Sequence, residues 1–537
     1  MKLTTLLRPL ACSLLLAAAC GGSENPATTA GTGGGHTGGG NTGAGGGGSK
    51  PLSVTWEDCN LFTDGPTFPA RCAKVETPLR WSDPQGKTIS VFVKKLPASK
   101  PRRGSVWLLD GGPGAGGVGL EGFAQFLDKN DGTLDIYIPH HRGTGQSTKL
   151  RCPGDAADSE KGLEITGDEW PACIDALKAE WGDGLGAFST TEAARDLGGL
   201  IDAEKQDGDQ VFVLGTSYGT YLANRYLRIF PEQATAAVLG SICPPDACHL
   251  DQFDVLYDQV GAQFLDMCGK DATCSSYLGP DPRKRLLDLY ASLDNGHCPA
   301  LADLGVDREL LRVILGEILN DWNGRLAIAP IIHRLERCDQ ADIDAFVHFV
   351  GVVFGAPDAP PDPMLSAWSF PLGNNITFSE MWTDPPPTAS ALIAASEATA
   401  ISKGISLGDA SVFPLWPRYP RDEYFGQWGD NNLPMLMLNG DLDPATPIWI
   451  ASAAAEHFKG PNQTFVTLPR APHNAIGASP ISADGTSCGA ELVLAFLADP
   501  TAPLDTSCKD QILPVKFAGA SWLAQKFFGT DDMFDNP

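Results

Sequence analysis

Short apolar runs rich in β-branched residues alternate with helical patterns along the chain beyond Pro51. This alternation is typical of a parallel sheet whose strands are joined by crossover helices. The predicted strands cover residues 90–94, 104–109, 134–138, 210–214, 434–438 and 463–468. We therefore expect an α/β fold with a mostly parallel central sheet flanked by helices. Ligands of such sheets bind beyond the carboxyl ends of the strands, so functional residues should follow the strands directly.

Amphipathic helices replace this alternation between about Cys243 and Pro414. Apolar residues at helical spacing predict helices at Arg308–Asn320 and Ala341–Phe354. The blocks before and after this stretch each carry too few strands for a complete sheet, so they should form one core that a helical cap interrupts. The predicted bounds are 51–244 for the N-terminal part of the core, 245–415 for the cap and 416–537 for the C-terminal part of the core.

The first 20 residues carry a targeting pattern. Lys2 and Arg8 accompany an apolar run at 10–19, which has the length of a signal peptide and is too short to cross a bilayer. The sequence Leu-Ala-Ala-Ala-Cys that ends at Cys20 resembles a bacterial lipobox, although Ala17 stands where a larger apolar residue is usual. We therefore expect residues 1–20 to direct export, with cleavage before Cys20 and a diacylglycerol on its sulfur. An ordinary secretory signal is the alternative.

Composition and charge exclude some classes of function and partner. Hydrophobic residues make up 43% and charged residues 19% of the chain, which is ordinary for a globular protein with a large core. The net charge of −26 would repel phosphates and anionic lipid surfaces. A nucleic-acid partner is therefore not expected, and membrane contact should occur only through the N-terminal lipid. The Gly-rich composition of residues 21–50 predicts a flexible tether between that lipid and the core.

Cysteine usage fits an exported protein. Of the 14 cysteines, Cys12 and Cys20 fall in the signal segment, which leaves 12, an even number. Their spacing suggests local disulfides, although connectivity does not follow from sequence alone: Cys59–Cys72, Cys152–Cys173, Cys243–Cys248, Cys268–Cys274, Cys298–Cys338 and Cys488–Cys508. Because paired CxxC motifs and cysteine–histidine clusters at zinc spacing are lacking, we expect no metal site.

Two pentapeptides fit the Gly-x-Ser-x-Gly pattern of a nucleophilic serine on a strand-to-helix turn, at 215–219 and 485–489. Ser217 follows a predicted buried strand and precedes a helical pattern. Ser487 instead follows a polar stretch, and it lies after His473, the last histidine of the chain. We therefore expect Ser217 to be the nucleophile and Ser487 to be structural, beside a disulfide.

A serine hydroxyl becomes a good nucleophile only when a histidine removes its proton and a carboxylate orients that histidine. His473 lies in a loop just after the last predicted strand, where it can reach the carboxyl edge of the sheet. The other histidines after Ser217 border cysteines or fall in helical patterns. Asp441 and Asp443 both follow the preceding strand. We expect Asp443 to be the catalytic acid, and we interpret Asp441 as a turn residue.

Acyl transfer also needs backbone donors for the oxyanion, one after the nucleophile and one from a glycine loop after an earlier strand. The expected donors are the N–H groups of Tyr218 and Gly112, with Gly111 as an alternative. A dinucleotide-binding loop is the competing interpretation of the glycines near 111–119. It lacks a complete GxGxxG motif and an acidic residue at the ribose-binding distance, so we expect no cofactor.

Together these motifs resemble the prolyl and tripeptidyl aminopeptidases, a peptidase branch of the α/β hydrolases, over most of residues 54–508. The resemblance rests on the Gly-Gly-Pro-Gly loop, the serine pentapeptide, the segments His141–Ser147 and Gly440–Pro447, and a C-terminal region with Cys488, Phe496 and Cys508. It implies an α/β-hydrolase fold with an inserted cap. It also implies a serine exopeptidase that acts on peptide substrates, releases short N-terminal peptides or amino acids and needs no cofactor.

The chain departs from the family pattern at two positions. His140 stands where the family has an aspartate before the Arg-Gly pair, and Asn474 follows His473 where glycine is common. The resemblance also implies that acidic side chains of the cap bind the amino group of the peptide. Glu380, between aromatic residues, is a candidate by its position, although a solvated glutamate is the simpler interpretation.

Two other functions fit the same residues. An esterase or lipase would use an identical triad, and the cap alone would decide between ester and peptide substrates. A lipoprotein of the cell envelope that kept the fold only as a binding module would not need a complete triad, so the residues favour an enzyme.

Overall fold

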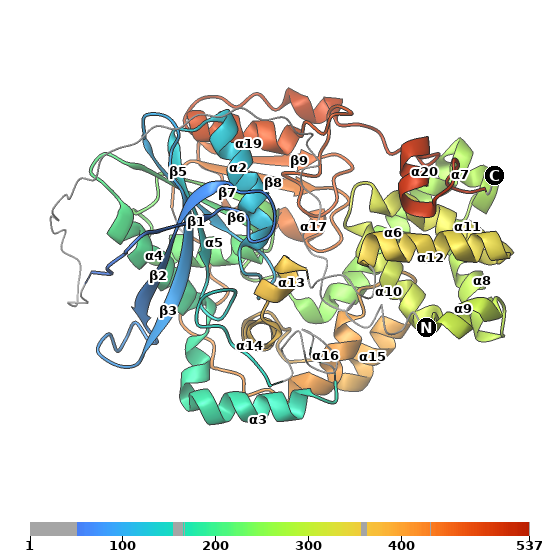
Figure 1. The fold of residues 1–537 in the computed structure, drawn as a ribbon, viewed down its shortest axis with the longest axis horizontal. Helices are drawn as coiled ribbons and strands as arrows, with labels where there is room; N and C mark the ends of the chain where they lie inside the picture. The colour runs from blue at the N-terminus through green and yellow to red at the C-terminus, as the bar shows by residue number, and fades with distance from the viewer. Residues whose placement is uncertain (1–50, 154–164, 166, 356–361, 430, 536–537) are drawn as a thin grey trace.

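The computed structural model describes residues 51–153, 165, 167–355, 362–429 and 431–535 (Figure 1). The predicted signal segment with Cys20 and the predicted tether lie outside the described residues. One sheet of nine strands has the order β1-β2-β3-β5-β4-β6-β7-β8-β9. Its strands are β1 (Glu57–Asn60), β2 (Pro69–Pro78), β3 (Thr88–Leu96), β4 (Gly104–Leu109), β5 (Leu134–His140), β6 (Gln210–Ser217), β7 (Ala236–Ile242), β8 (Met435–Gly440) and β9 (Gln463–Leu468).

The first three strands are antiparallel, and β3 also pairs antiparallel with β5. From β5 to β9 every neighbouring pair is parallel. The sheet is therefore mostly parallel, as the sequence predicts. Because the parallel strands all point the same way, their carboxyl ends meet at one edge of the sheet.

Helices cover both faces of the sheet, so the central strands are buried on both sides. Along β4, Trp107 packs in the apolar layer that includes helices α4 (Thr190–Glu204) and α5 (Tyr218–Ile229). The next residue, Leu108, packs in the opposite layer with α2 (Glu121–Asn130) and α19 (Cys488–Ala498). This double burial explains why the central strands are continuous apolar runs rather than alternating ones. The remaining core helices are α3 (Trp170–Trp181), α17 (Ile448–Ala451) and α18 (Ala453–His457).

The helical insertion lies between β7 and β8, and its described residues contain no strand. Its helices are α6 (Phe253–Lys270), α7 (Ala272–Leu278), α8 (Pro282–Asp294), α9 (Pro299–Leu304), α10 (Arg308–Leu319), α11 (Ile328–Arg337), α12 (Gln340–Phe354), α13 (Pro363–Ala367), α14 (Phe370–Glu380), α15 (Ala389–Glu397) and α16 (Ile405–Val412). We call α6–α12 the outer half and α13–α16 the inner half. The inner half contributes Leu372 and Phe378 to the apolar layer of the sheet. The outer half has an apolar cluster of its own.

The last helix, α20 (Ser521–Phe528), leaves the sheet and packs beside α12 in the outer half (Figure 1). Both Phe527 and Phe528 contact the ring of Phe349 on α12. The predicted C-terminal part of the core, 416–537, therefore ends on the helical insertion. The physical reason is that the phenylalanines of α20 find their apolar partner there.

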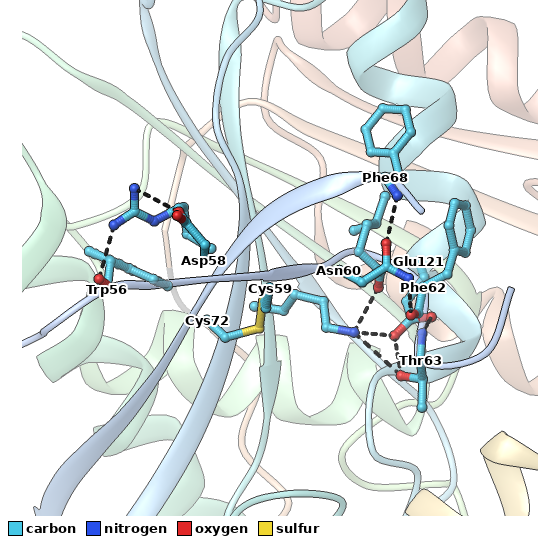
Figure 2. Close-up of a disulfide and its surroundings, with 12 residues drawn as sticks. Trp56, Asp58, Cys59, Asn60, Phe62, Thr63, Phe68, Cys72 and Glu121 are labelled. Atoms are coloured by element: carbon cyan, nitrogen blue, oxygen red, sulfur yellow. Dashed lines mark hydrogen bonds and ion pairs between the residues drawn. A yellow bond between two sulfur atoms is a disulfide. The ribbon is translucent and has the colours of Figure 1, made fainter. Parts of the chain in front are cut away.

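All six disulfides that the cysteine spacing suggests are present in the structure. Figure 2 shows Cys59–Cys72, which links the paired strands β1 and β2. Close by, the buried amine of Lys94 pairs with Glu121, whose carboxylate also accepts from the backbone N–H and the hydroxyl of Thr63. These contacts fix the antiparallel end of the sheet. Where the chain is described, none of its helices combines the length and the apolar character that crossing a bilayer requires.

Candidate active site

Ser217 is the last residue of β6 and lies directly before α5, on a sharp turn. Its backbone has φ 55° and ψ −127°, a conformation that residues other than glycine rarely adopt. The turn needs both flanking glycines, because a Cβ on Gly215 would lie 2.3 Å from the carbonyl oxygen of Gly219. A Cβ on Gly219 would lie 2.1 Å from the carbonyl oxygen of Leu109. The pentapeptide therefore forms the strained strand-to-helix elbow typical of a nucleophilic serine.

His473 and Asp443 are in direct contact. The Nδ1 atom of His473 lies 2.9 and 3.0 Å from the two carboxylate oxygens of Asp443, so Nδ1–H donates to that carboxylate. Both side chains are buried. With Nδ1 protonated, Nε2 is the nitrogen that can accept a proton.

Backbone and hydroxyl donors orient the Asp443 carboxylate. The backbone N–H groups of Ala445 and Thr446 donate to Oδ1 at 2.9 and 2.8 Å, and the Thr446 hydroxyl donates to Oδ2 at 2.8 Å. Sequence reasoning did not assign a role to Thr446. The sequence did contain a clue to this role, because Thr446 belongs to the Gly-x-x-Asp-Pro-x-Thr-Pro segment that carries the family resemblance.

The loop after β9 is docked against the end of β7. The backbone N–H of Ala475 donates to the Ser241 hydroxyl at 3.1 Å. Asn474 has φ 60°, the left-handed conformation that favours glycine. This conformation explains why glycine is common after the histidine in the family, and asparagine is among the residues that tolerate it best.

Asp441 binds a backbone amide of the loop that follows β9. Its Oδ1 accepts the backbone N–H of Arg470, and burial raises the pKa of its carboxyl group above the usual value. The contact joins the loops that follow β8 and β9, which is a turn-shaping role.

Ser217, Asp443 and His473 all lie at the carboxyl edge of the sheet, beyond β6, β8 and β9. The structure brings Asp443 and His473 into contact. Within the described residues, no hydrogen bond joins Ser217 to His473. Catalytic hydrogen bonds are often long in the absence of substrate and shorten once substrate binds.

The glycine loop that follows β4 passes close to Ser217. A Cβ on Gly111 would lie 3.0 Å from the Cβ of Ser217, so only glycine fits there without displacement. The N–H of Gly111 donates to Oδ1 of Asp110 at 2.8 Å. This bond occupies the Gly111 donor, so of the two alternatives Gly112 keeps the N–H that remains free for an oxyanion. Gly112 has φ 108°, which again requires glycine.

The inner half of the insertion covers this loop. The backbone N–H of Ser369 donates to the carbonyl of Gly114 at 3.0 Å. The carbonyl of Ala367 accepts from the N–H of Gly145 at 2.8 Å. The start of α14 therefore lies over the loop as a roof, held by its N-cap Ser369, and Ala367 at the end of α13 binds the core at Gly145.

Glu380, at the end of α14, is buried with 4% exposure. Its carboxylate pairs with Arg225 at 3.0 Å and accepts from the backbone N–H of Thr190 and the hydroxyls of Tyr221 and Tyr419. The interpretation of Glu380 as a solvated residue is wrong. The sequence alone does not reveal this role, because the buried partners of Glu380 come from α4, α5 and a loop that are distant from it along the chain.

The His-Arg-Gly-Thr-Gly segment is structural. Arg142 is fully buried, and its guanidinium binds both carboxylate oxygens of Asp196 on α4. His140, at the position of the family's aspartate, is a hydrogen-bond acceptor: its Nδ1 accepts the backbone N–H of Gln146 at 3.2 Å. Burial lowers the pKa of His140 to about 3, which keeps the ring neutral.

Ser487 of the second pentapeptide makes only structural contacts. Its hydroxyl donates to the carbonyl of Ile476 at 2.6 Å and lies 2.9 Å from the hydroxyl of Ser479. It precedes α19 and neighbours the Cys488–Cys508 disulfide, as predicted.

Comparisons with known proteins concern the fold and the family. Residues 104–266 match the family described as "alpha/beta hydrolase fold", and residues 413–508 match the family described as "TAP-like protein". The serine protease Hip1 of Mycobacterium tuberculosis is 23% identical over 84% of this chain and 89% of its own length. The tripeptidyl aminopeptidase of Streptomyces lividans is 26% identical over 45% of this chain and 48% of its own length. Among solved structures, the α/β hydrolase GrgF of Penicillium sp. sh18 aligns at 12% identity over 83% of this chain and 99% of its own, with a TM-score of 0.34.

The sheet order, the elbow and the two family matches lead to one conclusion. The chain has the α/β-hydrolase fold and resembles the tripeptidyl aminopeptidase-like serine peptidases.

Proposed function

We propose that the protein is a serine exopeptidase that releases short peptides or single amino acids from the N-termini of peptide substrates. The observation that carries the proposal is the hydrogen bond between His473 and the buried carboxylate of Asp443, at the sheet edge that also carries the Ser217 elbow. The relatives are serine peptidases of the α/β-hydrolase superfamily, which supports a hydrolase with serine peptidase activity.

The proposed reaction proceeds through an acyl-enzyme. Nε2 of His473 takes the proton of the Ser217 hydroxyl as the serine oxygen attacks the scissile carbonyl carbon. Asp443 holds the ring and stabilises the imidazolium that forms. The N–H groups of Tyr218 and Gly112 bind the oxyanion of the tetrahedral intermediate. The histidine then donates its proton to the leaving amine, and water releases the N-terminal product by the same steps in reverse order.

Substitutions test the assignment of the nucleophile. Ser217→Ala should lower kcat for tripeptidyl and aminoacyl amides by at least about 10⁴-fold. Ser487→Ala is the matched control, because this serine occupies the same pentapeptide pattern without a histidine partner. Full activity of Ser217→Ala would refute the proposal.

Two further measurements test the substrate class. Peptides with a free N-terminus should be cut near that end, whereas the same peptides with an acetylated N-terminus should not, as read by mass spectrometry. Turnover confined to p-nitrophenyl esters would instead indicate an esterase. Absence of labelling by a fluorophosphonate probe would indicate a binding protein.

We further propose that the protein is exported and held to a membrane by a lipid on Cys20. The six disulfides fit an exported protein, because such bonds persist in oxidising compartments. Palmitate labelling of the full chain should be lost in Cys20→Ala. Release of the wild-type protein as an unlipidated chain cut near Ala19 would contradict the lipid anchor and leave export intact.

A further inference from the structure

Asp110 is the first residue after β4, and it begins the glycine loop that passes over Ser217. Its side chain is buried, with 4% exposure. The carboxylate oxygen Oδ1 accepts the N–H of Gly111 at 2.8 Å. Burial raises the pKa of Asp110 to about 6, and hydrogen bonding by the backbone of Gly111 and Gly117 opposes that rise. The carboxylate therefore holds the start of the loop through its bond to Gly111.

The first residues of the loop have little side-chain packing to hold their conformation. Gly111, Gly112 and Gly114 carry no side chain, and glycine loses more backbone freedom on ordering than any other residue. The N–H groups of Gly111 and Gly112 belong to successive peptide planes, so fixing the first plane restricts the orientation of the second. In the structure the N–H of Gly111 donates to Asp110, and this contact does not use the N–H of Gly112.

We propose that Asp110 is a positioning residue, which binds the N–H of Gly111 and thereby orients the following peptide so that the N–H of Gly112 stabilises the oxyanion on Ser217. The inference rests on the proposed function, because it assigns a role within the same oxyanion hole.

The role requires an oxygen acceptor rather than a charge. The groups that influence Asp110 are backbone amides, and no charged side chain in the described part of the chain is among them. An asparagine carbonyl can accept the same N–H without a negative charge. Leucine has a similar shape and accepts nothing, so the pair Asp110→Asn and Asp110→Leu separates hydrogen bonding from packing.

The expected results follow from the cost of losing an oxyanion donor. Asp110→Leu should lower kcat for a peptide amide by about 10²-fold with KM nearly unchanged, because the interaction arises only in the transition state. Asp110→Asn should restore most of the wild-type kcat. Asp135→Ala is the control: Asp135 is also buried and accepts a backbone N–H, from Ala98 at 2.9 Å, but it lies near the opposite end of the sheet.

A second readout separates positioning from a general structural defect. Rates are expressed per active site, counted by complete fluorophosphonate labelling. A peptidyl trifluoromethyl ketone forms an oxyanion on the serine, so its inhibition constant should rise in Asp110→Leu by the same factor as kcat/KM falls. If Asp110→Leu does not fold, Asp110→Ala is measured in the same way.

The outcomes distinguish the two proposals. Unchanged kcat and unchanged inhibition by the ketone in the folded variant would overturn the role of Asp110, while an inactive Ser217→Ala would leave the proposed function standing. An active Ser217→Ala would remove both. A fall in kcat that Asp110→Asn does not restore would also overturn the inference, because it would indicate that the negative charge matters rather than the acceptor.

Discussion

The inner and outer halves of the helical insertion are adjacent in sequence but pack on different parts of the molecule. The inner half shares the apolar layer of the sheet, and α14 is hydrogen-bonded to the glycine loop near Ser217. The outer half surrounds a second apolar cluster, which α20 completes from the C-terminal side and which also includes Ile401 of the inner half and Leu442 and Ala445 of the core. One insertion therefore contains a part that packs on the catalytic core and a part that packs mainly around its own helices and α20.

This difference assigns separate roles to the two halves. The polar groups of the inner half, Glu380 above all, bind core residues that lie within a few positions of Ser217. Substitutions there should lower both the stability and kcat. The outer half touches the core mainly through apolar contacts and the C-terminal segment, so damage there should change stability with little effect on kcat. The following predictions test that separation.

The largest effect should follow Glu380→Ala, which breaks the docking of the inner half. Arg225 and Glu380 are both 3% exposed, and removal of the carboxylate leaves a buried guanidinium whose other carboxylate partner, Asp422, lies 3.6 Å away. Loss of one partner of a buried ion pair should lower the free energy of unfolding by about 4 kcal/mol. Denaturant unfolding measures this change, and amide turnover should fall as well.

Two controls accompany this prediction. Replacement of both partners by methionine should recover much of the lost stability, because apolar side chains can replace a buried pair. In the outer half, Glu336→Ala removes the partner of the half-exposed Arg285 and should cost less than about 1 kcal/mol. Equal costs for the two pairs would contradict the proposed difference between the halves.

A smaller, pH-dependent effect on stability should come from Asp110, which lies in the glycine loop that the inner half covers. Its pKa is about 6 in the folded protein against 3.8 for the free side chain, so the native state binds the proton more tightly than the unfolded state. Stability should therefore fall as the pH rises from about 4 to about 6, by about 3 kcal/mol for a shift of roughly two pKa units. Asp110→Asn removes this loss, so the variant should match the wild type at pH 4 and exceed it at pH 7. A constant difference across this range would contradict the prediction.

Arg334→Met should have a still smaller and more local effect in the outer half. The Arg334 side chain on α11 is buried, and it donates to the carbonyl oxygens of Met533, Asp532 and Asp535. Arg334 also pairs with the buried carboxylate of Asp342, but Arg337 remains bound to that carboxylate at 2.6 Å, so we expect a loss of about 2 kcal/mol rather than the cost of an unpaired buried charge. Hydrogen exchange over residues 521–535 should accelerate while kcat is unchanged. A large fall in kcat would show that the outer half is coupled to the active site.

Sequence patterns predicted the features that depend on local chemistry. Strands β4 and β9 have the predicted bounds, because both are apolar or β-branched and end at turn residues. The antiparallel strand β2 was not predicted, since it mixes arginine, lysine and glutamate with apolar residues and owes its pairing to neighbouring strands. Strand β7 was also missed, because its alanine, glycine and serine residues have low strand propensity and only burial makes it a central strand.

In the candidate site, too, local motifs predict some features and leave the long-range contacts unpredicted. Ser217 and the carboxylate of Asp443 follow from motifs that lie next to predicted strands, and the contact between Asp443 and His473 agrees with the order of those strands. The bonds of Glu380 to Thr190 and Arg225 and the attachment of α20 to the insertion join residues more than 100 positions apart. No local pattern encodes such contacts, because they arise only when separate elements pack together.

The smallest effects should come from a matched pair of helix N-caps, one in each half. In the outer half, Asp307 accepts the N–H of Leu310 at 2.9 Å at the start of α10, and in the inner half Ser369 accepts the N–H of Leu372 at 3.2 Å at the start of α14. Each alanine substitution should lower stability by about 1 kcal/mol. Only Ser369→Ala should also reduce kcat, because the same turn is bonded to Gly114 in the glycine loop and its hydroxyl donates to the carbonyl of Leu150 at 2.8 Å. Thermal unfolding and amide turnover measured on both variants decide the point: equal losses of kcat, or none in either, would mean that the roof over Ser217 is no more coupled to catalysis than the distant helices are.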